Sequence, residues 1–146
     1  SDLSAAALEV AKINVARHGL GARVRLIESD GLAKVTGRYD LILCNPPYVN
    51  DRSMAALPAE YRAEPELALA GGVDGMDFIR RLLRDVPDRL EANGVLVLEI
   101  GHERPHFEAA FPRLEALWLE TSAGSDMVVL LTAATLRNLV APGSTR

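Results

Sequence analysis

The stretch that decides the fold is YDLILCNPPYV, Tyr39 to Val49. Its first six residues are nearly all apolar, as is typical of a parallel strand that is covered on both faces. Two prolines follow, and because proline lacks a backbone N–H and fixes φ, the strand has to end there. The prolines also hold the backbone still where Asn45 presents an amide and Tyr48 a phenol. The motif therefore predicts a functional site at the carboxyl end of a buried strand.

Helix and strand patterns alternate on both sides of this strand. Upstream, a helix is predicted with Ser4 as its N-cap and Gly19 as its C-terminal stop, followed by a short strand over Arg23–Ser29. Downstream, apolar residues at helical spacing from Ile79 to Leu90 predict an amphipathic helix that Pro87 either kinks or ends early. The other expected elements are a strand over 94–101, a short helix over 103–111, and strands over 114–121 and 126–133.

This alternation predicts an α/β domain with a mostly parallel sheet. Only a short turn separates the last two strands, so they are expected to form an antiparallel pair, with one of them at a sheet edge. Val49–Val73 is predicted to be a loop, and loops of that length are usually functional or disordered. Its glycines do not follow a strand, so they indicate a turn before the helix rather than a phosphate site.

Composition sets further bounds. The chain has 146 residues, enough for one domain, of which 49% are hydrophobic and 25% charged. The formal net charge is -4 and no basic stripe is present, which argues against a nucleic acid as the direct substrate. Cys44 is the single cysteine, which excludes an internal disulfide, and we interpret it as a small core residue. No metal-ligand spacing, signal peptide or apolar run of membrane-spanning length occurs, and a cytoplasmic protein without a metal site is expected.

Asn-Pro-Pro-Tyr after a buried strand resembles the S-adenosylmethionine-dependent methyltransferases that act on planar nitrogens. These include DNA adenine-N6 methylases, some RNA base methylases and the protein glutamine-N5 methyltransferases. EPELALAGGVDGMDFIRRLL (Glu64–Leu83) and LVLEIG (Leu96–Gly101) resemble the glutamine methyltransferases. Within that group, residues 51–72 look like the branch that modifies a large-subunit ribosomal protein, whereas the release-factor branch is more divergent there. The resemblance runs from Asp2 to about Thr132.

For the fold, the resemblance implies the Rossmann-like sheet of a class I methyltransferase, of which this chain is the C-terminal portion. The family's first strands, its glycine-rich loop and its helical N-terminal domain have no counterpart in these residues. Residues 1–136 are thus expected to form part of a catalytic domain and residues 137–146 a disordered tail. Sheet edges left without the family's first strands are exposed, and self-association through them is expected.

For the site, the resemblance implies catalytic roles for Asn45 and the three residues after it, and S-adenosylmethionine as the cofactor. Taken without the resemblance, Asp2 is an ordinary acid at a helix start and Asp30 an ordinary loop aspartate. The resemblance assigns Asp2 to the ribose hydroxyls and places Asp30 near the adenine. The expected catalytic residues are Asn45, Pro46, Pro47 and Tyr48, and the expected cofactor-binding residues are Asp2, Asp30, Gly31 and Asn45.

The expected reaction is methyl transfer to the side-chain amide nitrogen of a glutamine in a ribosomal protein. Three alternatives stay open at this point. Release-factor glutamine would be methylated by the same chemistry, and DNA or RNA adenine N6 is another planar nitrogen that the motif could hold. Because the glycine-rich cofactor loop is missing, an inactive fragment that serves only as a binding module is the third.

Overall fold

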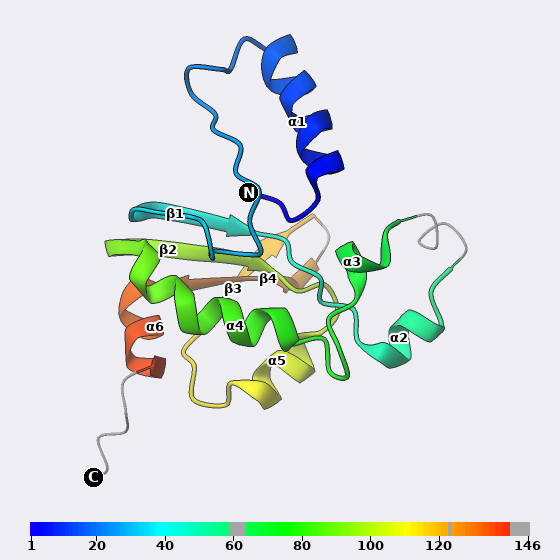
Figure 1. The fold of residues 1–146 in the computed structure, drawn as a ribbon. Helices are drawn as coiled ribbons and strands as arrows, with labels where there is room; N and C mark the ends of the chain where they lie inside the picture. Colours follow the sequence, from blue (N-terminus) through cyan, green and yellow to red (C-terminus); the bar gives the residue numbers. More distant parts are fainter. Residues whose placement is uncertain (59–63, 123, 141–146) are drawn as a thin grey trace. The chain divides into compact units, whose positions relative to one another are not determined.

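A computed structural model describes residues 1–58, 64–122 and 124–140 (Figure 1). The chain divides into two compact units, Ser1–Gly37 and Arg38–Arg146, and each is described by itself. The first unit contains one helix. The second contains a four-stranded sheet with its helices, together with the Asn-Pro-Pro-Tyr motif.

Helix α1, Ala5–Arg17, is the main element of the first unit. The Ser4 hydroxyl oxygen accepts a hydrogen bond from the Ala7 N–H at 3.2 Å, and so satisfies one of the free donors at the helix start. After the last turn, Gly19 has a φ of 64°, a conformation that glycine adopts easily and that ends the helix. The predicted helix and both of its end signals are therefore confirmed. None of its side chains is buried.

The strand predicted over Arg23–Ser29 is wrong. Arg23 lies in a turn, and the pairing of the segment is limited to a single parallel bridge between Asp2 and Glu28. The Asp2 N–H donates to the Ile27 carbonyl at 3.1 Å, and the Ser29 N–H donates to the Asp2 carbonyl at 2.9 Å. A strand needs a neighbouring ladder, and in this chain only the first residues lie beside the segment.

The second unit is built on the sheet order β1-β2-β4-β3. Its strands are β1 (Tyr39–Cys44), β2 (Leu90–Glu99), β3 (Leu117–Thr121) and β4 (Gly124–Thr132). The β1 strand is parallel to β2, and β4 is antiparallel to both β2 and β3. The α/β fold is confirmed, as are the antiparallel final pair and the edge position of one of its strands. In the described sheet, one parallel pairing is followed by two antiparallel ones.

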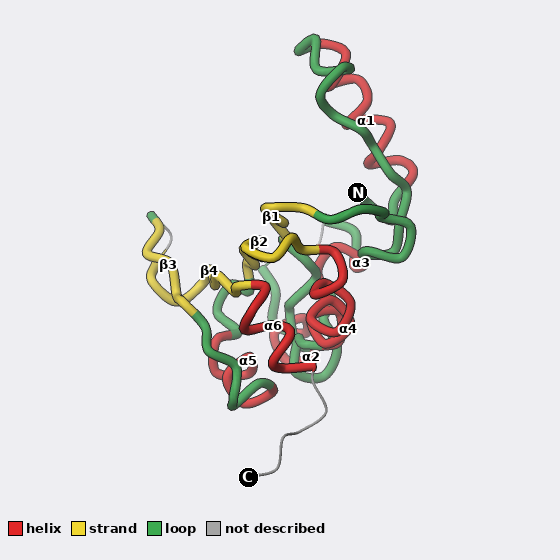
Figure 2. Tube along the Cα trace, turned by 90° about the vertical axis from the view of Figure 1, so that its left-hand side faces the viewer, coloured by secondary structure: helices red, strands yellow, loops and turns green. Residues whose placement is uncertain are grey.

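One face of this sheet carries the core of the second unit. Helices α4 (Asp77–Asp85), α5 (Arg104–Ala110) and α6 (Ala133–Val140) lie on the same side of the sheet in Figure 2. Alternate residues of the strands point to that side, as strand geometry requires. The largest buried apolar side chains include Ile79, Leu83, Leu96, Leu98, Phe107, Val129, Leu131 and Leu136.

Pro87 ends helix α4 early, which was one of the two predicted outcomes. The α-helix stops at Asp85, and a 3₁₀ turn, η2 (Val86–Arg89), follows with Pro87 inside it. Leu90, which continued the helical pattern in the sequence, instead begins β2 and is buried there. Its apolar side chain fits both patterns, so the sequence periodicity could not place the boundary.

Two further predictions need correction. The predicted loop Val49–Val73 contains two short helices, α2 (Asp51–Ala55) and α3 (Glu66–Leu69), each too short for a periodic pattern. The predicted disordered tail 137–146 is helical in its first four residues, because α6 runs to Val140. Thr132 accepts from the Thr135 N–H at 3.1 Å at the start of α6, and Leu136 is buried. Residues 141–146 of that tail lie outside the described residues.

Candidate functional site

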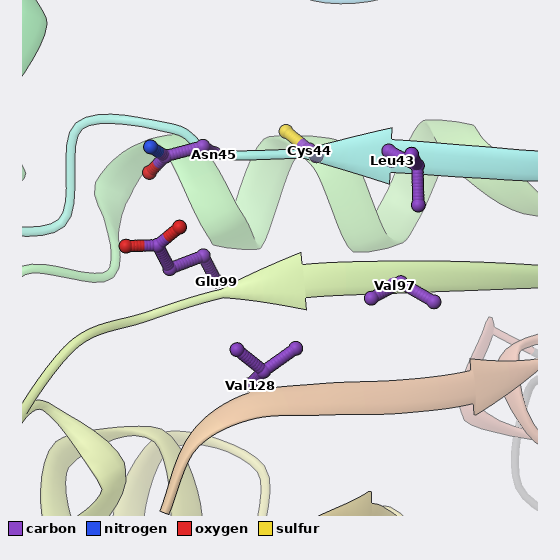
Figure 3. A pocket seen from close by; sticks show the side chains of 6 residues that line it. All are labelled: Leu43, Cys44, Asn45, Val97, Glu99 and Val128. Atoms are coloured by element: carbon purple, nitrogen blue, oxygen red, sulfur yellow. The ribbon is translucent and has the colours of Figure 1, made fainter. Parts of the chain in front are cut away.

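The candidate site lies where β1 and β2 end at the same edge of the sheet. Because Cys44 is paired in parallel with Leu98, the next residues along the two strands, Asn45 and Glu99, lie side by side. Figure 3 shows the Asn45 amide and the Glu99 carboxylate projecting toward one another at this edge. They border a pocket of about 360 Å³, whose other lining residues are Leu43, Cys44, Val97 and Val128.

The two prolines are less exposed than Asn45, which precedes them. Pro46 is buried and Pro47 is half-buried, whereas the Asn45 side chain is exposed. The backbone is thereby anchored directly after Asn45, and the amide remains open to the pocket. This is the arrangement that the sequence predicted for the motif, with the polar group presented from a fixed turn.

Tyr48 is held by its hydroxyl and by its ring. The hydroxyl donates to Glu99 Oε1 at 3.2 Å. The ring lies against the Cα of Gly101, where an added Cβ would come within 2.6 Å of the Tyr48 Cε2 atom. Gly101 also has a φ of 52°, so a larger residue would be both strained and obstructed there. The orientation of Tyr48 is thus fixed by the last residue of β2, Glu99, and by Gly101 just beyond it.

The backbone after Tyr48 pairs with the glycine-rich segment downstream. Val49 forms a parallel bridge with Ala70; its N–H donates to the Leu69 carbonyl at 2.9 Å and its carbonyl accepts from the Gly71 N–H at 2.8 Å. The Asp51 N–H donates to the Gly72 carbonyl at 3.0 Å. Part of the Glu64–Leu83 segment therefore supports the motif physically. Its glycines form a turn before α4, as predicted.

Three polar residues of this region were missed by sequence reasoning. Glu99 ends an apolar strand, and acids at strand ends of parallel sheets are a known signal for a site, so it could have been found. Asn50 and Glu103 are both buried and their side chains are hydrogen-bonded at 2.7 Å. No sequence pattern indicates that pair, because the two residues are far apart in the chain and each alone looks like a surface residue.

Cys44 is a wall of the pocket and not a nucleophile. Burial raises the pKa of its thiol to about 11, well above the ordinary value. The thiol therefore stays protonated at neutral pH, and only the thiolate is strongly nucleophilic. The interpretation of Cys44 as a small core residue needs correction, because the residue is only half-buried and lines the pocket at the end of β1.

Three of the four residues predicted to bind cofactor, Asp2, Asp30 and Gly31, belong to the first unit. The Asp2 side chain is exposed, and its Oδ1 accepts from the Ser4 N–H at 2.8 Å. The bridge between Asp2 and Glu28 sets Asp2 beside the segment that leads into the Asp30–Gly31 turn. Gly31 has a φ of 53°. Asn45 and the other motif residues belong to the second unit.

No described helix is both long and apolar enough to cross a membrane. Among the residues that the structure describes, no group of three His, Cys, Asp or Glu side chains is placed to hold a metal ion.

Comparison with known proteins adds independent findings. Residues 1–60 match the family model described as "Methyltransferase small domain". A ribosomal protein uL3 glutamine methyltransferase of Bordetella pertussis is 59% identical over 132 residues, which are 90% of this chain and 44% of that protein. The same-named protein of Burkholderia pseudomallei is 53% identical over 143 residues, 92% of this chain and 47% of that protein. That of Neisseria gonorrhoeae is 51% identical over 131 residues, 90% of this chain and 44% of that protein.

The chain thus spans less than half the length of the curated relatives that it matches. Over about nine-tenths of its own length, however, more than half of its residues are identical to those of each of these relatives. The resemblance to the protein glutamine methyltransferases, and within them to those that are named for a ribosomal protein, is therefore confirmed.

Proposed function

We propose that this chain is the C-terminal part of the catalytic domain of a methyltransferase that modifies the side-chain amide of a glutamine in a ribosomal protein. The observation that carries the proposal is the Asn45 side chain, exposed at the end of β1 while the next residue, Pro46, is buried. The names of the relatives support the substrate, since each is a ribosomal protein uL3 glutamine methyltransferase. No broad basic surface is needed for such a substrate, in keeping with the net charge of -4.

An amide nitrogen is a weak nucleophile because its lone pair is delocalised into the carbonyl. The protein's task is therefore to orient the nitrogen and to favour the charge that develops on it. In our proposal, the Asn45 side-chain oxygen and the Pro46 carbonyl each accept one hydrogen bond from the substrate NH₂. Pro46 and Pro47 keep the two acceptors from relaxing, since proline fixes φ.

Tyr48 and Glu99 complete the acceptor side. Tyr48 is assigned to stack on the planar amide. The hydrogen bond from its hydroxyl to Glu99 supports a fixed orientation of its ring. We add Glu99 to the predicted residues, because a carboxylate beside Asn45 favours positive charge on the nitrogen as the new bond forms (Figure 3).

The cofactor that fits this reaction is S-adenosylmethionine, whose sulfonium supplies the methyl group and a good leaving group. Asp2 and Asp30 would hold its ribose and adenine, with Gly31 allowing the backbone to turn, and Asn45 would border it from the acceptor side. The exposed carboxylate of Asp2 suits ribose hydroxyls chemically, because it can accept from both of them. The family's glycine-rich loop would have to supply the remaining contacts.

We also propose that the protein acts in the cytoplasm, where ribosomal proteins are made, and that its edge strand β1 can pair with a second copy. In the described sheet, β1 is paired on one side only, with β2. Sedimentation of the 146-residue chain tests this directly. A concentration-dependent dimer is expected, and a monomer at every concentration would contradict it.

The function is tested with an enzyme of the relatives' length and methyl-labelled cofactor. Ribosomal proteins, a peptide-chain release factor and unmethylated DNA are offered in parallel, and the label is mapped. We expect label on a ribosomal-protein glutamine. Label on the release factor would move the protein to that branch with the chemistry intact, and label on DNA would make it an adenine methyltransferase. No label on any of them would favour the inactive binding module.

Asn45→Ala in the same enzyme tests the mechanism. Because Asn45 mainly orients the acceptor, the variant is expected to lose orders of magnitude in turnover while it binds the cofactor nearly as well as the parent does. Near-normal turnover would rule out the proposed role of Asn45. Asn14→Ala, on the surface of α1, is the matched control and is expected to turn over normally.

A further inference from the structure

A buried amide–carboxylate pair lies at the far end of the Asn-Pro-Pro-Tyr loop. Asn50 and Glu103 are only 7% and 8% exposed, and the Asn50 Nδ2 donates to Glu103 Oε1 at 2.7 Å. The other end of the same amide, Oδ1, accepts from the Ser53 N–H at 2.9 Å. Both ends of the Asn50 side chain are therefore occupied, and only one orientation of the amide satisfies both partners. We call Asn50 and Glu103 the loop clamp.

Glu103 is itself held from several directions. Its second carboxylate oxygen contacts the Nδ1 of His106, whose side chain is 47% exposed. Its backbone N–H donates to the Ile100 carbonyl at 3.1 Å, and its carbonyl accepts from the N–H of Phe107, a core residue, at 2.9 Å. A buried carboxylate without partners is strongly unfavourable. Here its partners tie the start of α5 to the loop after β1.

The clamp sits on the same short segment as the acceptor groups. Asn45 and Asn50 are the two ends of this segment, and Tyr48 lies between them. At its first end, the segment leaves the paired strand β1. At its second end, Asn50 is the N-cap of α2, and its side chain reaches across to Glu103. The path between two fixed ends decides where Asn45 Oδ1 and the Pro46 carbonyl point.

We call residues 45–50 the acceptor loop. We propose that Glu103 is a positioning residue for this loop. It acts through Asn50, so that Asn45 Oδ1 and the Pro46 carbonyl converge on one substrate NH₂. The proposal rests on the proposed function and extends it to residues that would not touch the substrate. Misplacement of a reacting group by about 1 Å can lower the rate about 100-fold. A small shift of the loop after loss of the clamp would therefore be enough to slow methyl transfer.

The test exchanges the donor and the acceptor of the hydrogen bond between positions 50 and 103. Asn50→Asp alone sets two buried carboxylates against each other, and like charges at this separation are strongly unfavourable. Adding Glu103→Gln restores one donor and one acceptor with the direction of the hydrogen bond reversed. Asp at position 50 also remains a good N-cap for α2, so the bond from the Ser53 N–H is kept. Glu108→Gln is the matched control, because Glu108 is on the same helix in an exposed ion pair with Arg104.

In the enzyme of the relatives' length, with labelled cofactor and ribosomal protein uL3, we expect Asn50→Asp to lower kcat about 100-fold and the double variant to recover to within about tenfold of the parent. The KM for the cofactor should stay unchanged in both. A double variant no more active than Asn50→Asp would overturn the proposal. An unchanged kcat in a folded Asn50→Asp variant would also overturn it.

A second readout needs neither activity nor cofactor. In the 146-residue chain, exchange of the Val49, Asp51 and Ser53 amide hydrogens reports the loop directly. Faster exchange of these amides in Glu103→Ala, restricted to the loop while the β2 and β4 amides keep their protection, is expected. Equal exchange in Glu103→Ala and the parent would overturn the proposal. If the enzyme of the relatives' length methylates nothing, the proposed function fails. The clamp is then judged by hydrogen exchange of the loop amides alone.

Discussion

Helices α1 and α4 illustrate a difference between the two units of the chain. The 13 residues of α1 bury no side chain, whereas the nine residues of α4 bury Ile79, Leu82 and Leu83. The predicted cofactor residues Asp2 and Asp30 stand in the unit of α1, and the acceptor motif stands in the unit of α4. The acceptor side of the proposed reaction thus has a hydrophobic core of its own. In the unit of the cofactor side, backbone hydrogen bonds of Asp2 with Ile27 and Ser29 join the start of the chain to the segment after α1.

The largest effect is expected from removing core volume in the second unit. Leu98→Ala in β2, at a fully buried position, should lower the free energy of unfolding by about 2–5 kcal/mol. Val10→Ala in α1, where the side chain is 59% exposed, should change it by less than about 0.5 kcal/mol. Urea unfolding followed by the fluorescence of Trp118, the chain's only tryptophan, measures the loss in Leu98→Ala, and circular dichroism at the helical band measures the change in Val10→Ala. Equal losses of unfolding free energy in the two variants would contradict the difference in burial between α1 and the core of the second unit.

Cys44 gives the next largest effect. Its pKa is raised by burial to about 11 from a reference value of 9.0, so thiolate at pH 8 should be about 100-fold scarcer than in the unfolded chain. Alkylation by iodoacetamide should be slower by about that factor. Val10→Cys combined with Cys44→Ser moves the thiol to exposed α1 and is expected to react at the ordinary rate. A native Cys44 that reacts as fast as this control would contradict the burial of the thiol.

The same shift has a consequence for stability at alkaline pH. The folded state holds the Cys44 proton more tightly than the unfolded state does, because the folded pKa is the higher one. Stability is therefore fully present below about pH 9 and falls as the pH rises toward 11, by at most about 2–3 kcal/mol. Unfolding curves at pH 8 and pH 10.5 should differ in the parent, and differ less in Cys44→Ala.

Gly101→Ala should have a smaller effect. The added Cβ would meet the Tyr48 ring at 2.6 Å, and the φ of 52° disfavours alanine. We expect a loss of about 1–3 kcal/mol in the second unit, together with a displaced Tyr48. Gly21→Ala is the control in the first unit, because nothing lies within 4 Å of a Cβ built there. If the two variants melt at the same temperature, the contact between Gly101 and Tyr48 does not hold the loop.

Ser4→Ala is expected to have the smallest effect. It removes the oxygen that caps α1 and should weaken that helix by about 1 kcal/mol. The loss should appear in circular dichroism at the helical band but not in the Trp118 transition, because Trp118 lies in the second unit. Ser4→Asp keeps a capping oxygen and serves as the control. A shift of the Trp118 transition in Ser4→Ala would mean that the two units unfold together.

Local patterns predicted the elements whose signals are contained in a few neighbouring residues. The cap at Ser4, the stop at Gly19, the early end of α4 at Pro87 and the antiparallel final strands are all confirmed. Errors arose where structure depends on a distant partner. Arg23–Ser29 has strand composition, but its neighbour in this chain is limited to one bridge. The helices α2 and α3 are too short to show a period.

The site was predictable to a similar extent. Asn45 and the prolines are marked by the abrupt end of an apolar strand, and the residues that follow them by resemblance to a family. The roles of Asn45, Pro46, Pro47, Tyr48, Asp2, Asp30 and Gly31 remain predictions. Glu99 could have been found as the acid that ends an apolar strand. Its contact with Tyr48, and the contact of Asn50 with Glu103, join residues about fifty positions apart, which one sequence does not reveal. They became visible only once β1 and β2 were paired.

The parallel pairing of β1 and β2 has a consequence for the order of folding. Strands β3 and β4 are neighbours in the chain and can pair early, since hairpins close quickly. Strand β1 can pair with β2 only after the whole crossover from Asn45 to Arg89 has been arranged, and this crossover contains both the acceptor loop and α4. During refolding, Trp118 fluorescence should therefore recover before the loop amides are protected. The acceptor site would be the last part of its unit to form, and a nascent chain could not bind substrate until its sheet is complete.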